Sequence, residues 1–201
     1  MRLFLHVRYV AASAMMPEFE INDRVLVESI SNYLNRPFRY GEVILFYPPP
    51  SEMGGEELHS DFLSVMGRLT GLPFLPYEPA FLKRVIGVPG DRVRIESGRG
   101  VFVNDKLLDE SAYIRKPANY DLVVLGDIGG RSVSGQTLIP YSGDLARQPI
   151  IVPPGQLFVL GDNRNNSEDS HVFGMLDQRR VIGRVQMVLW PRLKTIGIPS
   201  G

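Results

Sequence analysis

Apolar and polar residues alternate along much of this chain in short runs, and many of these runs end at turn-forming residues. A period of two places successive side chains on opposite faces of an extended backbone, so such runs predict β-strands. Residues 92–96 and 101–103 predict a hairpin, because a glycine-bearing turn separates them. The predicted strands cover residues 1–10, 23–28, 42–47, 80–87, 92–96, 101–103, 156–160 and 181–190.

The strands are broken by 20 glycines and 16 prolines, a pattern typical of an all-β barrel or folded sheet rather than alternating βαβ units. Two segments interrupt it. Residues 51–79 contain a stretch, 61–69, that could form a short helix, and the turn-rich segment 109–153 contains a weak strand at 121–125. We predict a mostly β fold in one domain, residues 1–201. Its core comprises about 1–108 and 154–201, and a β-rich insertion comprises about 109–153.

The composition is that of a globular protein without charge bias. At 201 residues, with 44% hydrophobic and 22% charged residues, the chain can bury one substantial core. It has 22 Lys and Arg against 22 Asp and Glu and no long basic run, so we expect no nucleic-acid partner. The lack of cysteine excludes a thiolate nucleophile, a disulfide framework and a cysteine metal site.

The sequence has no run of about 18 apolar residues, so none of its segments is predicted to span a membrane. Its first ten residues are too short and too charged for a secretory signal peptide. The apolar stretch 72–81, interrupted by prolines, has two interpretations. It either dips into a lipid surface or packs on its own core.

Lys83 lies in an apolar run between Leu82 and Val85, next to Arg84. Neighbouring side chains of a strand point to opposite faces, so one of these two cations must point inward or into a cleft. A desolvated lysine has a lowered pKa and can act as a neutral general base near pH 7. The alternative is an exposed lysine on an edge strand, where it would protect against aggregation.

The loop from Gly161 to Ser170 follows a predicted strand and gathers Asp, Asn, Arg and Ser into ten residues. Such residues often bond only to nearby backbone, which would make the loop an ordered polar turn. Its density of charge also fits a polar scaffold beside a buried lysine. In that scaffold the hydroxyl of Ser167 or Ser170 would orient the amine.

Three stretches, at residues 14–17, 83–91 and 161–170, resemble motifs of type I signal peptidases in their residues and in their order along the chain. That family carries Ser-Met-x-Pro, then Lys-Arg-Val-Ile-Gly-x-Pro-Gly-Asp, then Gly-Asp-Asn-Arg-x-Asn-Ser-x-Asp-Ser. The matches run from about Arg8 to Trp190, and the end of the third stretch is most similar to the cyanobacterial and plant thylakoidal branch. The resemblance implies a folded β-sheet barrel of the kind shared by signal peptidases and LexA.

The resemblance also implies roles for single residues. Lys83 matches the general base of a Ser–Lys dyad, and position 14 matches its nucleophile. Ser167 matches the hydroxyl that bonds the lysine, and Asp169 belongs to the supporting polar cluster. The backbone N–H of residue 14 and the position of Ala12 match the oxyanion hole of the family. Shallow pockets for small substrate side chains are implied at Val10, Met15, Phe19, Phe81 and Leu82, with the substrate extended between residues 10–12 and 78–81.

Three positions depart from the family pattern. Ala14 stands where the family has its nucleophilic serine, and its methyl group cannot attack a carbonyl. Ala12 lacks the hydroxyl that many members add to the oxyanion hole, and Glu18 stands where threonine is usual. Ser13 is one residue out of register, so in an extended segment it would face away from Lys83. We interpret the chain as an inactive Ser-to-Ala form, and a natural pseudoenzyme that binds signal peptides is the alternative.

The resemblance implies a membrane-associated serine endopeptidase that removes signal peptides from exported precursors after Ala-x-Ala, with no metal or cofactor. Its expected partners are signal peptides and the membrane surface. We expect the natural protein to carry an anchor in a plasma or thylakoid membrane, with the catalytic domain on the periplasmic or lumenal side. This chain would then be a soluble truncation. A LexA-like self-cleaving regulator, which uses the same Ser–Lys pair, stays open as another class; it would need an N-terminal DNA-binding domain, and none precedes Arg8 in this sequence.

Overall fold

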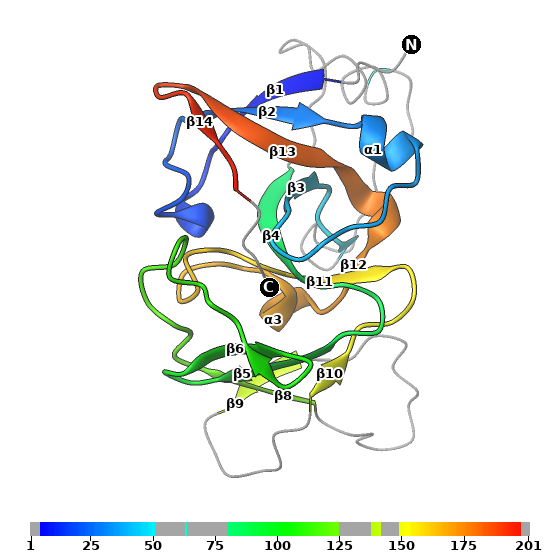
Figure 1. The fold of residues 1–201 in the computed structure, drawn as a ribbon, viewed down its shortest axis with the longest axis vertical. Coiled ribbons are helices and arrows are strands. Elements are labelled where there is room, and N and C mark those ends of the chain that lie inside the picture. The colour runs from blue at the N-terminus through cyan, green and yellow to red at the C-terminus, as the bar shows by residue number, and fades with distance from the viewer. Residues whose placement is uncertain (1–4, 51–62, 64–79, 125–137, 142–148, 198–201) are drawn as a thin grey trace.

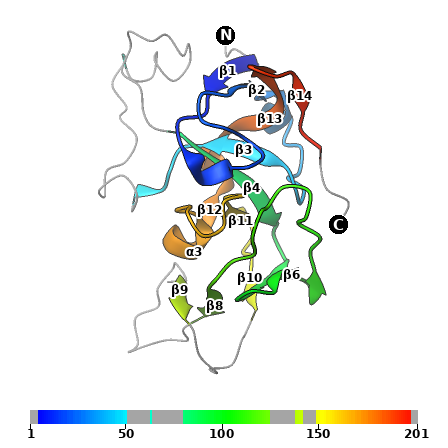
Figure 2. The same ribbon diagram turned by 90° about the vertical axis from the view of Figure 1, so that its left-hand side faces the viewer.

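Antiparallel strands dominate the computed structural model, which describes residues 5–50, 63, 80–124, 138–141 and 149–197. The larger sheet curls into a half-barrel, and the smaller sheet lies at the opposite end of the molecule (Figure 1). A view turned by 90° shows the same division, with β11 (Gln156–Leu160), β12 (Leu176–Asp177) and the short helix α3 (Ser170–Phe173) between the two ends (Figure 2). The mostly β fold expected from the alternating pattern is therefore confirmed.

The larger sheet has eight strands, and each pair of neighbours is antiparallel. Its long central strand, β13 (Val181–Trp190), pairs with strands from the first quarter of the chain, so the sheet brings the two ends of the sequence together. The remaining strands, in sheet order around β13, are β1 (Leu5–Tyr9), β2 (Arg24–Glu28), β3 (Val43–Phe46), β4 (Phe81–Gly87), β11 (Gln156–Leu160) and β12 (Leu176–Asp177), while β14 (Lys194–Thr195) pairs with β13.

Apolar side chains cover both faces of this sheet. Val43 and Leu45 of β3 enter one core with the apolar residues of β2 and β13, whereas Ile44 and Phe46 enter another on the opposite face. This alternation follows from the strand period of two. β4 lies between β3 and β11 in this doubly covered region, and its last five residues are all buried.

The smaller sheet contains the predicted hairpin and two very short strands. A third core joins the sheets, because Ile86 and Phe158 of the larger one pack with Val93 and Val101 of the smaller one. The smaller sheet has the order β10 (Ile150–Ile151), β5 (Arg92–Glu96), β6 (Gly100–Val103) and β7 (Lys106–Leu107), and β8 (Asp121–Val124) pairs separately with β9 (Leu138–Tyr141).

Four short helices occupy connections in the described ranges. They are the 3-10 helices η1 (Ser13–Met15) and η3 (Gln178–Arg180) and the α-helices α1 (Ile30–Tyr33) and α3 (Ser170–Phe173). Within the described ranges no helix has the length and apolar character needed to cross a membrane.

Most predicted strands match observed ones to within one or two residues at each end. The strands predicted at 92–96, 156–160 and 181–190 coincide with β5, β11 and β13. β10, from the predicted insertion, pairs with β5 from the predicted core, and the division into core and insertion stays a prediction. The predicted helix at 61–69 lies outside the described residues apart from Leu63, as does the apolar stretch up to residue 79.

Candidate active site

Lys83 is buried on a central strand. β4 has β3 on one side and β11 on the other, and Lys83 pairs with Ile44 in the register. Only 3% of its surface is exposed, and its Nζ donates a hydrogen bond of 2.7 Å to Ser167 Oγ. The alternative interpretation, an exposed lysine on an edge strand, is therefore wrong, because Lys83 is buried and β4 lies between two other strands of the sheet.

Of the two loop hydroxyls considered, Ser167 contacts the amine. The side chain of Ser170 is turned to β11, where its Oγ accepts a hydrogen bond of 2.9 Å from the N–H of Val159. The short helix α3 begins at Ser170, and the Ser170 side chain is directed toward β11 at this point. Ser167 comes three residues earlier, and its hydroxyl remains available to Lys83.

Gly161 lets the loop approach the residue-14 segment. A Cβ at this position would lie 2.6 Å from the Ala14 carbonyl oxygen and closer still to Ser167 Oγ, both far inside ordinary contact distance. The Ala14 carbonyl also accepts a hydrogen bond of 3.0 Å from the N–H of Asn163. Residue 14 and Ser167 therefore meet at a place where no other residue than glycine fits without displacement.

Residue 14 lies within η1 rather than in an extended segment. The turn closes because Met16 N–H donates to the Ser13 carbonyl at 3.1 Å, which corrects the extended backbone assumed for residues 13–15. The side-chain amide of Asn166 donates to Ser13 Oγ at 3.3 Å. Within the part of the chain that the structure describes, the N–H of Ala14 has no hydrogen-bond acceptor, as is usual in the first turn of a helix.

Asp169 holds both ends of the loop. Its Oδ2 accepts from the N–H of Gly161 at 2.9 Å, and its Oδ1 lies 2.6 Å from His171 Nδ1 and caps α3. The His171 ring stacks on Tyr120 with centroids 4.4 Å apart. Burial, followed by the charge of Asp169, raises the pKa of Tyr120, so this phenol stays neutral.

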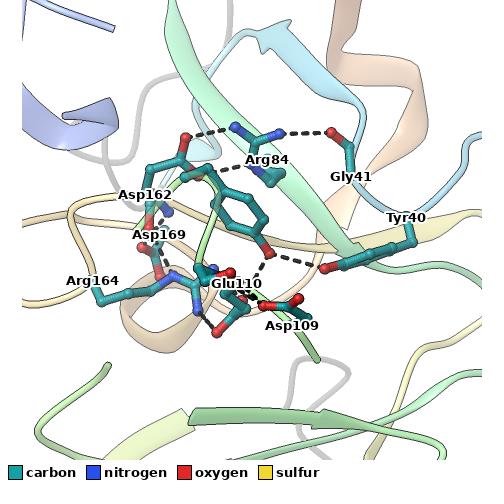
Figure 3. A network of polar contacts seen from close by, with 11 residues as sticks. Tyr40, Gly41, Arg84, Asp109, Glu110, Asp162, Arg164 and Asp169 are labelled. Carbon is teal, nitrogen blue, oxygen red and sulfur yellow. Dashed lines mark hydrogen bonds and ion pairs between the residues drawn. The ribbon is translucent and has the colours of Figure 1, made fainter. Parts of the chain in front are cut away.

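Arg84 binds the same loop through Asp162 (Figure 3). Its Nε and Nη2 donate to the two carboxylate oxygens of Asp162 at 2.8 and 2.7 Å, and its Nη1 donates to the Gly41 carbonyl at 2.9 Å. Both ion-pair partners are almost completely buried. Adjacent residues of one strand thus contact two parts of the loop, because their side chains alternate between faces.

A second buried ion pair joins the loop to residue 110. Arg164 donates to the two carboxylate oxygens of Glu110 at 2.8 and 2.6 Å, and Tyr113 Oη donates to Glu110 Oε1 at 3.0 Å (Figure 3). Tyr113 also lies 2.9 Å from the hydroxyl of Tyr40. Burial, followed by the charge of Glu110, raises the pKa of Tyr113, so its hydroxyl remains a donor.

Lys83 and residue 14 line one cleft of about 530 Å³, which we call the substrate cleft. Its lining comes from three segments, residues 8–15, 80–83 and 165–168, together with Val25 and Leu45. Four of the predicted pocket residues line this cleft, namely Val10, Met15, Phe81 and Leu82. Phe19 does not line it and is fully buried in the core behind. Ala12 lines the cleft, while residues 78–79 lie outside the described ranges.

Sequence reasoning missed several contributors to this site. Val25 and Leu45 line the cleft from β2 and β3, where the alternating pattern marks them as inward-facing without indicating a cleft. Glu110 had no signal at all, because its partner Arg164 is 54 residues away. Gly161 and Asn163 belong to the recognised loop, but only the fold shows their contacts with residue 14.

Comparison with known proteins identifies the family of this chain. The family described as "Signal peptidase, peptidase S26" matches residues 1–190. "Probable signal peptidase I-2" of Synechocystis sp. is 36% identical over 92% of this chain, which spans 62% of that protein's length. "Signal peptidase I" of Leptolyngbya laminosa is 34% identical over 96% of this chain and 73% of its own length.

The similarity extends to plants. "Thylakoidal processing peptidase 1, chloroplastic" of Arabidopsis thaliana is 27% identical over 92% of this chain and 42% of its own length. A crystal structure of a signal peptidase I from Enterococcus faecalis V583 is 23% identical and covers 74% of this chain and 97% of its own, with a TM-score of 0.40. The predicted resemblance to signal peptidases, including cyanobacterial and thylakoidal ones, is confirmed. The chain belongs to the signal peptidase family, peptidase S26.

Proposed function

We propose that this chain is the catalytic domain of a type I signal peptidase in which Ala14 occupies the position of the nucleophilic serine. One observation carries the proposal most strongly. A lysine amine with 3% residue exposure bonds a serine hydroxyl at 2.7 Å in the cleft that residue 14 also lines, in a member of this family. Burial of that kind disfavours a charged amine and suits a general base.

With serine at position 14, its Oγ would attack the carbonyl carbon of the scissile peptide bond, and Lys83 Nζ would accept the hydroxyl proton. The amine would then protonate the leaving nitrogen, releasing the mature chain and leaving an acyl-enzyme. Lys83 would next take a proton from water, whose oxygen attacks the ester carbonyl, and would return that proton to the serine oxygen at position 14 as the signal peptide is released. The bond to Ser167 Oγ uses one N–H of Lys83 and restricts the orientation of its lone pair.

The backbone N–H of residue 14 is the proposed donor to the developing oxyanion, and Ala12 supplies no hydroxyl beside it. Loss of one such donor typically costs about a hundred- to a thousand-fold in rate. We therefore expect Ala12→Ser, in the form with serine at position 14, to raise the cleavage rate. An unchanged or lower rate would show that the oxyanion is held by other donors.

The proposed substrate is an extended signal peptide ending in Ala-x-Ala. Val10, Met15 and Leu82 narrow the cleft with bulky apolar groups and favour small side chains one and three residues before the cut. Phe19 would act from behind this wall, since it packs with Met15 in the core rather than in the cleft. No step in this chemistry uses a metal or a cofactor.

Ala14→Ser tests the proposal directly. This variant should cleave a peptide containing Ala-x-Ala, and Lys83→Met added to it should abolish cleavage while the fold, measured by circular dichroism, remains. Ser13→Ala is the matched control, because it removes the neighbouring hydroxyl and should leave cleavage intact. Cleavage that survives without Lys83, or that requires Ser13, contradicts the assignment.

Ala14 itself favours a second candidate, a protein that binds signal peptides without cutting them. Both candidates predict binding of a signal peptide to the chain as it stands. They differ in the Ala14→Ser variant, because a binding protein gains no cleavage from the added hydroxyl.

We also propose that the protein works at a membrane surface, on the periplasmic or thylakoid-lumenal side. The thylakoidal relative supports this location. Co-sedimentation with lipid vesicles, reduced by Phe74→Ser, would support it, and the lack of vesicle binding by the unaltered chain would oppose it.

A further inference from the structure

A second cleft, of about 720 Å³, lies on the other side of the loop that carries the candidate site. Met16, Asn163 and Asn165 contribute to its lining, and so do residues 97–98 and 115–119. Asn165 also lines the substrate cleft, so the two clefts adjoin at this residue. The volume is within the usual range for binding sites, but the proposed catalysis does not use it.

The order of residues along one segment relates the two clefts. Residues 8–15 line the substrate cleft, and Met16, the next residue, lines the second cleft. A peptide that lies along residues 10–12 and reaches residue 14 at its scissile bond therefore continues over Met16 and Asn163. That continuation is the part of the precursor after the cut.

The far wall of the second cleft is fixed to the catalytic loop. Asn165 Oδ1 accepts from the N–H of Asn119 at 2.8 Å, and its amide donates to the Pro117 carbonyl at 3.1 Å. The N–H of Gly98 donates to the Ala118 carbonyl at 2.8 Å and joins this wall to the hairpin turn. The cleft is therefore a built feature rather than the gap beside a loose loop.

The accessible charged groups that line the second cleft are both positive. Asp162 and Arg164 line the cleft but are buried and paired with Arg84 and Glu110. Arg115 and Lys116 are exposed, and neither makes an ion pair with any residue that the structure describes. Two uncompensated positive charges therefore face whatever chain occupies the cleft.

We infer that the second cleft binds the first residues of the mature chain and that Arg115 and Lys116 select precursors with acidic residues there. This inference rests on the proposed function for the direction in which the substrate lies. Exposed ion pairs of this kind change affinity by about 2- to 30-fold for two charges, and salt weakens them.

Binding to the chain as it stands tests the inference without cleavage. Three fluorescent peptides share one signal-peptide half ending in Ala-x-Ala and carry three Asp, three Ser or three Lys after it. Anisotropy should give the Asp peptide about 2- to 30-fold tighter binding than the Ser peptide at low salt and the Lys peptide the weakest binding, with the differences lost at high salt. Arg115→Gln with Lys116→Gln should remove this preference.

Arg39→Gln with Lys106→Gln is the matched control, because both side chains are exposed and lie outside both clefts. Equal affinity for the three peptides overturns the inference, and so does a preference that the control pair removes equally well. Cleavage of the same peptides by Ala14→Ser is scored separately. Cleavage without an acidic preference supports the proposed function but contradicts the role inferred for the second cleft. An acidic preference in binding without cleavage supports that role but contradicts the proposed function.

Discussion

Gly161→Ala would separate the segments that meet at the candidate site. The added methyl group would lie 2.6 Å from the Ala14 carbonyl oxygen and nearer still to Ser167 Oγ, whereas ordinary contact begins at 3.4 Å. The φ angle of Gly161 is not in the left-handed region, so alanine can adopt this backbone conformation. The perturbation is therefore steric and local.

The size of the effect follows from these distances. The Ala14 carbonyl has to move by about 0.8 Å to reach ordinary contact, and backbone cannot rotate away as a side chain can. Ser167 can rotate, but its 2.7 Å bond to Lys83 then breaks. Overpacking of this kind costs about 1–3 kcal/mol, which lowers Tm by about 2–12 °C at this chain length. A displacement near 1 Å at a catalytic group costs about a hundredfold in rate.

Thermal unfolding of Gly161→Ala followed by circular dichroism measures the stability, and peptide cleavage in the form with serine at position 14 measures the rate. Gly183→Ala is the control, because its methyl group would lie 2.8 Å from Val27 Cγ1 and closer still to the Glu28 carbonyl oxygen, and none of these three residues lines the cleft. It should lose similar stability and keep cleavage per folded molecule. An unchanged Tm and rate in Gly161→Ala, or an equal loss of cleavage in Gly183→Ala, would contradict a steric effect specific to the candidate site.

Three more predictions concern the surrounding contacts. In the form with serine at position 14, Ser167→Ala should lower kcat about a hundredfold with little change in KM, because Lys83 loses its orienting partner, and an unchanged kcat would count against this role. Glu110→Ala should cost about 3–5 kcal/mol in chemical denaturation because it leaves Arg164 buried and unpaired, and a loss below about 1 kcal/mol would contradict this. The folded-state pKa of Tyr113 is raised above the unfolded value near 10. Its contribution to stability is therefore full below pH 10 and declines above it, and Tyr113→Phe should make the alkaline decline shallower by about 1.4 kcal/mol per pH unit. Denaturant titrations above pH 10 with equal slopes would show that this phenol does not titrate on unfolding.

The longer strands could be predicted from the sequence because they contain enough residues to display a period. β5, β11 and β13 are examples, with five to ten residues each. The strands β7, β10, β12 and β14 contain two residues each, and two residues are too few to show a period. Only the fold shows that they pair. Turns such as η1 also depend on their surroundings, which is why an extended segment was expected there.

In the candidate site, too, some features could be predicted from local sequence, while others depend on the fold. The apolar neighbours and the strand period predicted that Lys83 or Arg84 points inward, but they left an exposed Lys83 open, and the fold buries both side chains. The choice between Ser167 and Ser170 depends on where α3 begins, because that turn directs Ser170 to β11. The partner of Arg164 lies 54 residues away, at Glu110, and no local pattern indicates it.

The two buried ion pairs are better understood as fixing the position of the loop than as adding to stability. Removing Arg84, Asp162, Arg164 and Glu110 from water is costly, and the attraction within each pair offsets that cost only because both pairs are bidentate. What the pairs do achieve is geometric, since they tether the loop at two positions, 162 and 164, to β4 and to residue 110. Ser167 lies on the same loop and bonds Lys83, the strand neighbour of Arg84. The position of the proposed base relative to its hydroxyl therefore depends on charges that never touch the substrate, and for that reason Glu110→Ala should impair cleavage even in the molecules that remain folded.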